Sequence, residues 1–320
     1  MQHCHIHESV DRTFQDIRLS DKPFGGLSVV FGGDFKQILP VIVKFSRAQI
    51  VGACIQRSQL WLSVKVLKLT ENMRLNTHVD AERNFAKWQL EIGHGKHTDE
   101  ARNTKLPDHF KCTENTISSL ISAVYPGIKE LPHPPDLYFA ERTILTSRND
   151  DVDDINEKML LDFPGVMKEF LSADSVKANN EDGQEELLYP VEYLNSITCS
   201  GLPLHKIKLK VGCPVMILHN LNPGEGVCNG SQGIVTRMSN RVLDVHLLTG
   251  DHAGKTTFIP RISIIPTSTQ VPFEFRRQQF PVKVSFAMSI NKSQGQSVKH
   301  VGLDLRSAVF THGQLYVAVL

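Results

Sequence analysis

A glycine pair, an aspartate and a glutamine follow an apolar segment near the start of the 320-residue chain. This segment, residues 27–31, is β-branched and aromatic, which predicts a strand buried on both faces of a parallel sheet. Gly33, Asp34 and Gln37 come directly after it. Ligands of open α/β sheets bind at the carboxyl ends of strands, where glycine admits close backbone approach and glutamine orients a phosphate or a water. The alternative is a strand that ends in a glycine turn with a surface glutamine.

A second polar turn with a glycine follows another apolar run, residues 280–288, towards the other end of the chain. Its lysine and side-chain amides are donors that suit a loop in contact with phosphates and a nucleic-acid backbone. The alternative is a plain loop that leads into a helix. The residues that carry this expectation are Lys292, Ser293, Gln294 and Gly295.

Two more predicted strands end in polar residues. The alternating segment 64–69 predicts a strand, and Arg74 after it either stabilises charge on a transferring phosphoryl group or forms a surface ion pair. Residues 142–149 predict a strand and turn that lead into a helix, which places Thr146 and Asn149 at an anion-binding helix N-terminus. A simple helix cap at Asn149 or Asp150 is the alternative.

The amino-acid sequences of these segments closely resemble those of the petite-integration-frequency (PIF) helicases, most of all their Helitron-type branch. Pro-Phe-Gly-Gly, an apolar strand and Gly-Gly-Asp-Phe-Lys-Gln-Ile-Leu-Pro-Val, within residues 23–41, resemble the third helicase motif. Residues 289–297 resemble the fifth motif, while residues 69–74 and 310–320 resemble the fourth motif and the start of the sixth. The resemblance covers essentially the whole chain.

The resemblance implies a role for each candidate residue. Gln37 would sense the γ-phosphate of ATP and couple it to DNA, and Arg74 would reach the phosphates from across a cleft, so these two are the catalytic candidates. The implied nucleotide-binding residues are Gly33, Asp34, Gln37, Arg74 and Gly295, and the implied DNA-binding residues are Thr146, Asn149, Lys292, Ser293 and Gln294.

The implied activity is that of a superfamily-one, 5′-to-3′ DNA helicase that uses ATP and Mg²⁺. Its partners would be single-stranded and duplex DNA, and it would act as a monomer. Its location would be intracellular, in the nucleus rather than in the mitochondrion. The implied processes are DNA repair, recombination, telomere maintenance or transposition. The family's phosphate-binding loop and Asp-Glu pair precede the segment that starts at Met1, and its arginine finger follows the last motif, so we expect these 320 residues alone to be inactive. The alternative is an ATPase-dead remnant that binds single-stranded DNA or a partner, or a truncated gene model.

The resemblance also implies the fold, an α/β architecture of RecA-like P-loop helicase lobes in which helices flank a parallel sheet. The first lobe would be incomplete, and the second would carry an inserted small β-barrel, which the short strands and turn signals after residue 206 also predict. The expected divisions are residues 1–67 for the second half of the first lobe, 68–205 and 272–320 for the second lobe, and 206–271 for the barrel.

One segment looks like a phosphate loop. Residues 250–257, Gly-Asp-His-Ala-Gly-Lys-Thr-Thr, have three residues between the glycines where that loop needs four, and a strand-like segment follows. A hairpin turn is therefore expected there.

Charge, cysteine content and hydropathy indicate which partners and metal sites the chain is expected to have. A net charge of +1 does not by itself indicate nucleic acid, so DNA contact would need local patches such as residues 206–210 or 276–277. Six scattered cysteines suggest reduced thiols. His3, Cys4, His5 and His7 are spaced too tightly for half of a zinc finger, and no metal site is expected. No apolar run approaches a membrane span, and no membrane partner is expected.

Overall fold

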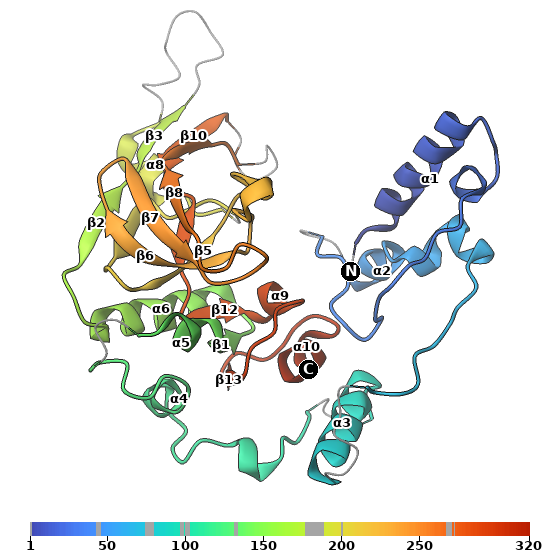
Figure 1. The fold of residues 1–320 in the computed structure, drawn as a ribbon, viewed down its shortest axis with the longest axis horizontal. Helices are drawn as coiled ribbons and strands as arrows, with labels where there is room; N and C mark the ends of the chain where they lie inside the picture. The colour runs from blue at the N-terminus through green and yellow to red at the C-terminus, as the bar shows by residue number, and fades with distance from the viewer. Residues whose placement is uncertain are drawn as a thin grey trace, which may run out of the picture. The chain divides into compact units, whose positions relative to one another are not determined.

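The computed structural model describes residues 2–42, 46–73, 80–96, 99, 103–130, 134–176, 189–199, 201–266, 271 and 273–320. The chain forms two compact units (Figure 1). Unit 1 comprises Met1–Lys111 and Ala308–Leu320, and unit 2 comprises Cys112–Ser307. The four-part division expected from the sequence stays a prediction, since compactness alone does not identify lobes. In the described part of the chain, no helix is both long and apolar enough to span a membrane.

Unit 1 is built from helices in the part that the structure describes. The first helix is held at both ends: the His3 side chain accepts from His5 N, and Leu19 ends the helix in the left-handed conformation. The buried Asp11 carboxylate accepts from Phe24 N at 2.5 Å, which fixes the following turn against the helix. The elements are α1 (Cys4–Arg18), η1 (Pro23–Gly26), α2 (Arg47–Gly52), η2 (Ile55–Arg57), η3 (Gln59–Ser63), α3 (Asp80–Gly93), η4 (Asp108–Phe110) and α10 (Gln314–Val319).

The two strands predicted for unit 1 are wrong in this structure. Residues 27–31 and 64–69 are extended but pair with no strand, and their apolar side chains are open to solvent, Val30 with 94% of its surface exposed. A strand needs a neighbour to receive its backbone hydrogen bonds and cover its faces. The described residues of unit 1 contain no strand that could serve as that neighbour.

Unit 2 contains the parallel sheet that the sequence predicted. Its order is β12 (Ala287–Ser289), β1 (Arg142–Thr146) and β13 (His300–Asp304), and both pairings are parallel. Helix α6 (Asn149–Asp162) packs against β12 and β1, and α4 (Ile117–Val124) packs against β13. The short helix α5 (Asp136–Ala140) precedes β1, and the short helix α9 (Ile290–Ser293) directly follows β12. The α/β assignment is therefore confirmed.

Antiparallel strands make up the rest of unit 2. A five-stranded sheet has the order β11 (Val282–Val284), β5 (Pro214–Ile217), β6 (Gln232–Met238), β7 (Val242–Leu247) and β8 (Thr256–Pro260). A second sheet joins β3 (Ala173–Val176), β10 (Phe275–Gln279) and β9 (Ile262–Ile264), and β2 (Lys168–Leu171) pairs with β4 (Lys206–Leu209). Two short helical segments, α8 (Val191–Ser196) and η5 (Pro223–Glu225), complete the unit.

The strands predicted for residues 206–271 are confirmed, but the closed barrel is not. Among the described residues, no pairing joins the edge strands β11 and β8. Closure needs every strand in one continuous ring, whereas after β8 the chain passes directly into β9, which pairs with β10 in another sheet. The predicted hairpin at residues 250–257 is confirmed, because β7 and β8 pair antiparallel on either side of the turn.

A shared hydrophobic core makes unit 2 a single body. It includes Ile144 and Phe286 at the parallel sheet and Val215 and Leu243 in the five-stranded sheet. All four side chains are fully buried. A smaller cluster around Phe275 lies beneath α8 and β3. The strand ends of the parallel sheet are thereby held at fixed positions.

Candidate functional site

The carboxyl ends of the three parallel strands meet at one edge of the sheet in unit 2. Thr146 is level with Ser289 on one side and with Asp304 on the other. The Ser147 hydroxyl donates to Ser307 O at 2.9 Å, which ties the segment after β1 to the segment after β13. The polar segments that the sequence singled out after residues 146 and 289 thus lie at a single edge, where open α/β sheets bind ligands.

The two residues predicted to contact DNA after β1 differ in exposure. Thr146 is fully buried, and its hydroxyl donates to Arg148 O at 2.9 Å and accepts from Arg148 N at 3.2 Å. Asn149 is exposed and is the first residue of α6, whose N-cap position is Arg148, with no side-chain cap. Thr146 therefore shapes the turn, and Asn149 is not the cap. Their DNA contacts stay predictions.

The segment after β12 forms one wall of a groove of about 750 Å³. The buried Ser293 hydroxyl donates to Ile290 O at 2.8 Å, so this residue supports the turn from inside. Gly295 has φ +85°, a conformation that favours glycine. The groove is lined by Lys292, Gln294, Gly295 and residues 296–299, and also by Ala140, Glu141 and the turns 229–232 and 248–250.

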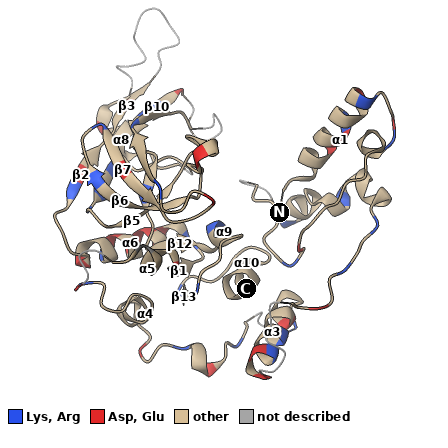
Figure 2. Cartoon of the chain, in the orientation of Figure 1, with Lys and Arg blue, Asp and Glu red and all other residues tan. Residues whose placement is uncertain are grey.

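Lys292 is the basic residue of α9, which carries a blue segment in Figure 2. Desolvation and the neighbouring Lys283 lower its pKa, while Asp153 opposes them. Asp153 is itself paired with Lys283 at 2.5 Å. The turn 229–232 is attached to the loop by a hydrogen bond from Gln232 Nε2 to Gln296 Oε1 at 3.2 Å. The groove thus has a fixed shape and a cationic, amide-rich wall, which suits a phosphate backbone.

In unit 1 the third-motif segment contacts the sixth-motif segment. Asp34 accepts from Lys36 N at 3.0 Å, lies 3.7 Å from Lys36 Nζ, and accepts from the Tyr316 hydroxyl. Burial and the Asp34 carboxylate raise the pKa of Tyr316 to about 12. His312 Nε2 lies 3.0 Å from Phe35 O. The sequence predicted both motifs but not the contacts between them.

The remaining nucleotide candidates of unit 1 surround this contact. Gln37 N donates to Asp34 O at 3.1 Å, so residues 34–37 form a tight turn. Gly33 is exposed, and a side chain at its position would meet no described atom within 4 Å. Arg74 lies outside the described residues. These nucleotide-binding roles stay predictions.

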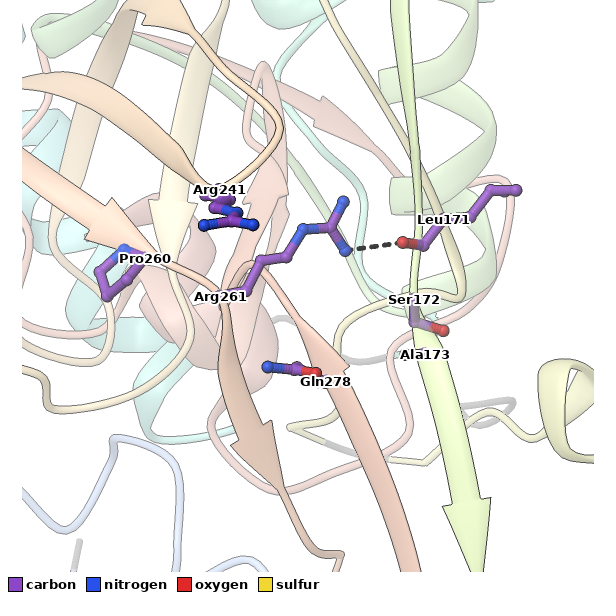
Figure 3. Close-up of a pocket in the computed structure, with 7 residues that line it drawn as sticks. All are labelled: Leu171, Ser172, Ala173, Arg241, Pro260, Arg261 and Gln278. Atoms are coloured by element: carbon purple, nitrogen blue, oxygen red, sulfur yellow. Dashed lines mark hydrogen bonds between the residues drawn. The ribbon is translucent and has the colours of Figure 1, made fainter.

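A second hollow, of about 420 Å³, was not expected from the sequence (Figure 3). Arg241 and Arg261 line it from the β6–β7 turn and the β8–β9 junction. Arg261 donates to Leu171 O at 2.6 Å and to Asn240 O at 2.9 Å, and its guanidinium lies 4.7 Å from the centre of the Phe280 ring. Isolated arginines at strand ends carry no motif, so the sequence offered no signal for them.

The basic patches proposed from the sequence are partly internal. Arg277 is fully buried and donates to both oxygens of Asp174, and the Lys210 ammonium donates to the carbonyls of Leu161 and Phe163. Lys206 and Lys208 pair with Glu169 and Glu157. A run of charges in sequence is therefore not a free cationic face here, and the patch prediction is wrong for Arg277 and Lys210.

Two family models match the chain. The PIF1-like helicase model matches residues 1–103, and the model of the 2B domain of the DNA helicase Pif1 matches residues 192–238. Among curated relatives, the ATP-dependent DNA helicase PIF1 of Homo sapiens is 28% identical, and that of Danio rerio 27% identical. Each alignment covers 100% of this chain and 43% of the relative, so the chain spans less than half of their length.

Solved structures share the fold. A Pif1 helicase from Bacteroides in complex with ADP-AlF3 and ssDNA has a TM-score of 0.63 at 22% identity, with 100% of this chain and 65% of that chain covered. The Pif1 helicase of Candida albicans has a TM-score of 0.60 at 20% identity, and the match covers 99% of this chain and 67% of that chain. The family models and the curated relatives agree that the chain is similar to PIF1-like helicases.

Proposed function

We propose that this chain supplies the γ-phosphate sensor and the DNA-contacting loop of an ATP-dependent, 5′-to-3′ DNA helicase. The observation that carries the proposal is similarity along the whole chain to helicases named ATP-dependent. Within that similarity, the turn that holds Gln37 is anchored to α10, and the 292–299 loop lines a groove. Monomeric action, duplex DNA as substrate, a nuclear setting and roles in repair, recombination, telomere maintenance or transposition belong to the same proposal.

The described residues do not by themselves provide a magnesium site. Mg²⁺ prefers carboxylates and phosphate oxygens in near-octahedral geometry. The Asp34 carboxylate already accepts from Lys36 N and from Tyr316, and Lys36 Nζ lies beside it. Its role is to shape the turn so that Gln37 is presented at one place. Any bound Mg²⁺ and ATP phosphates would therefore need residues beyond this turn.

The groove in unit 2 is the part that we assign to single-stranded DNA. One wall carries an ammonium group and side-chain amides, and the backbone at Gly295 is unobstructed. Such donors bind phosphates without reading sequence. Binding should therefore be sensitive to salt and insensitive to base composition.

Replacing Lys292 tests the groove. Lys292→Ala should weaken binding of an oligothymidylate uniformly across sequences and reduce the slope of log affinity against log salt by about 1. Lys129→Ala is the matched control, since Lys129 is an exposed lysine of the same unit that pairs with Asp162 away from the groove lining. Fluorescence anisotropy over a salt series measures both slopes. Equal slopes for the two variants would remove the groove from the proposal.

Replacing Gln37 tests the coupling. In a chimera that joins this chain to the preceding part of a curated relative, Gln37→Ala should leave DNA-stimulated ATP hydrolysis partly intact and abolish strand separation, because the glutamine orients groups around the γ-phosphate. Both rates are measured on the same preparation. Wild-type values for both in the variant would show that Gln37 has no such role.

A second function, an ATPase-dead module that binds single-stranded DNA or a partner, is favoured by one observation. Within these 320 residues, the segment that looks most like a phosphate loop is a hairpin turn between β7 and β8. The chimera discriminates between the two functions, because a helicase part restores unwinding and a binding remnant does not.

A further inference from the structure

Three donor side chains converge just before and within the first turn of α1. One ligand atom from each of His3, Cys4 and His5 lies within 4.8 Å of the other two. Cys4 Sγ is 3.6 Å from His3 Nδ1, and the centres of the two imidazole rings are 4.3 Å apart. Cys4 is buried, His3 is half-buried and His5 is exposed, so the group opens to solvent on one side.

The fold overcomes the close spacing of these residues in sequence. His3 is the N-cap of α1, and its Nδ1 atom accepts from His5 N at 3.2 Å, which turns the imidazole back over the first helical turn. Consecutive side chains on a regular helix point about 100° apart and do not share a ligand. The extended conformation of His3, with φ −66° and ψ 141°, removes that restriction for His3, and the ligand atoms of the helical pair Cys4 and His5 still lie within 4.8 Å of each other at the first turn.

The distances suit a tetrahedral zinc ion. Zn–S is about 2.3 Å and Zn–N about 2.0–2.1 Å, so sulfur and nitrogen on a tetrahedral zinc are about 3.6 Å apart. That is the separation of Cys4 Sγ and His3 Nδ1 in the structure, and zinc binding at Nδ1 would replace the hydrogen bond that this atom now accepts from His5 N. A thiolate with two imidazoles is also the donor set that zinc prefers over Mg²⁺ or Ca²⁺.

A second thiol flanks the group. Cys4 N donates to Ala53 O at 2.8 Å, which brings Cys54 next to the start of α1. Cys54 is buried and directly follows Ala53, whose carbonyl accepts that bond.

We propose that His3, Cys4 and His5 bind one zinc ion and that Cys54 provides the fourth ligand. The site joins α1 to the segment that follows α2, two parts of unit 1 that are about fifty residues apart in sequence. It is separate from the Asp34–Tyr316 contact and from the groove in unit 2, and it does not depend on helicase activity.

The test uses the 320-residue chain without an oligohistidine tag and with two extra residues before Met1, so that the terminal amine cannot act as a ligand. Metal-free protein is titrated anaerobically with Co²⁺ and then with Zn²⁺. We expect one equivalent of Co²⁺ to produce thiolate-to-cobalt charge-transfer absorption, and Zn²⁺ to displace it. No such absorption at one equivalent would overturn the proposal.

Single substitutions assign the ligands. His5→Gln should weaken Zn²⁺ binding at least about 100-fold, the upper end of what loss of an outer-shell partner costs. His5 is exposed, so this variant should fold even if Cys4→Ser does not. His7→Gln is the control, because His7 lies on the same helix but contacts Phe31 instead of the cluster. Equal affinity in the His5 and His7 variants would overturn the site, and unchanged affinity in Cys54→Ser would overturn the fourth ligand.

Discussion

Gly313 is the residue on which the apposition of the third-motif and sixth-motif segments depends. Its φ is +77°, and a Cβ atom there would lie 2.5 Å from Gln37 C, Gln37 O and Lys36 O. The neighbours are backbone atoms, which cannot rotate away as a flexible side chain can. The positive φ and the close approach both require glycine at this position.

Gly313→Ala should therefore destabilise unit 1. The left-handed conformation alone costs an L-residue about 1–2 kcal/mol, and the backbone clash should add about 1–3 kcal/mol. Gly95→Ala is the matched control, since Gly95 has φ +69° but no described atom within 4 Å of a Cβ. Trp61 and Trp88, the two tryptophans of the chain, both lie in unit 1, so their fluorescence in urea follows this unit. Equal losses in the two variants would show that the 34–37 turn does not contact Gly313.

Tyr316 makes the same contact dependent on pH. Its pKa is raised to about 12 from the ordinary value of 10, so the fold favours the neutral phenol. The contribution of Tyr316 to the free energy of unfolding is complete below pH 10 and is lost as the pH rises from 10 to about 12.

Tyr316→Phe should lower the stability of unit 1 at neutral pH by about 1.5–3 kcal/mol, the range for a hydrogen bond to a charged group. It should also flatten the decline in stability above pH 10. Tyr193→Phe is the control, because Tyr193 is 49% exposed and its ring stacks against that of Tyr189. Urea midpoints measured at several values between pH 7 and pH 12 test both effects, and a variant that keeps the wild-type alkaline slope would contradict the assignment.

At the scale of elements, one buried ion pair holds β3, β10 and α8 together. Arg277 on β10 donates to Asp174 on β3 at 2.7 Å and to Leu194 O in α8 at 3.0 Å, and neither side chain of the ion pair is exposed. Asp174→Asn would leave a buried guanidinium without its counter-charge. We expect a loss of about 3–5 kcal/mol in the free energy of unfolding of unit 2.

The control for this variant is another acid of the same unit. Glu169→Gln removes the partner of Lys206 in an ion pair whose side chains are about half exposed, which should cost less than about 1 kcal/mol. Far-UV circular dichroism in urea reports both variants. Similar midpoints for the two would mean that Arg277 is solvated in solution.

Elements were predictable where the whole of their environment lies in the described chain. The segment 142–146 and the run 280–288 were expected as strands, and β1, β11 and β12 confirm them because each pairs within unit 2. The segments 27–31 and 64–69 are equally apolar but have no neighbouring strand in the described chain. Composition alone therefore predicted two strands that the structure does not contain. Strand propensity describes a fit to a sheet and cannot indicate whether the sheet is there.

The candidate site residues also divide into those that local sequence predicts and those that depend on tertiary packing. Lys292, Gln294 and Gly295 were predicted from a polar glycine turn after a strand, which is local in sequence, and they line the groove, while their contacts with DNA and nucleotide stay predictions. The contact of Asp34 with Tyr316 joins residues some 280 positions apart, and the burial of Arg277 depends on three elements. Such features follow from tertiary packing, for which a single sequence carries no direct signal.

The activity of the 320 residues as one molecule depends on how many parts of a phosphoryl-transfer site they hold. That chemistry needs a phosphate cradle, a metal-holding carboxylate and a group that stabilises transition-state charge. The described residues offer Gln37 in an ordered turn, but the Asp34 carboxylate is engaged and the loop at residues 250–257 is a hairpin turn. An arginine finger alone is worth about 10³–10⁵ in rate.

We therefore expect the isolated 320-residue chain to show no ATP hydrolysis above background, with or without single-stranded DNA, while it keeps weak, salt-sensitive DNA binding through the 292–299 loop. Exposed apolar side chains in residues 27–31 and 64–69 should also make it prone to association, so the assay is done on monomer isolated by size exclusion. Steady-state phosphate release is measured beside the chimera described above as the active control. DNA-stimulated turnover of about one per second, the lower end of kinase-type rates, would show that the chain holds a complete nucleotide site.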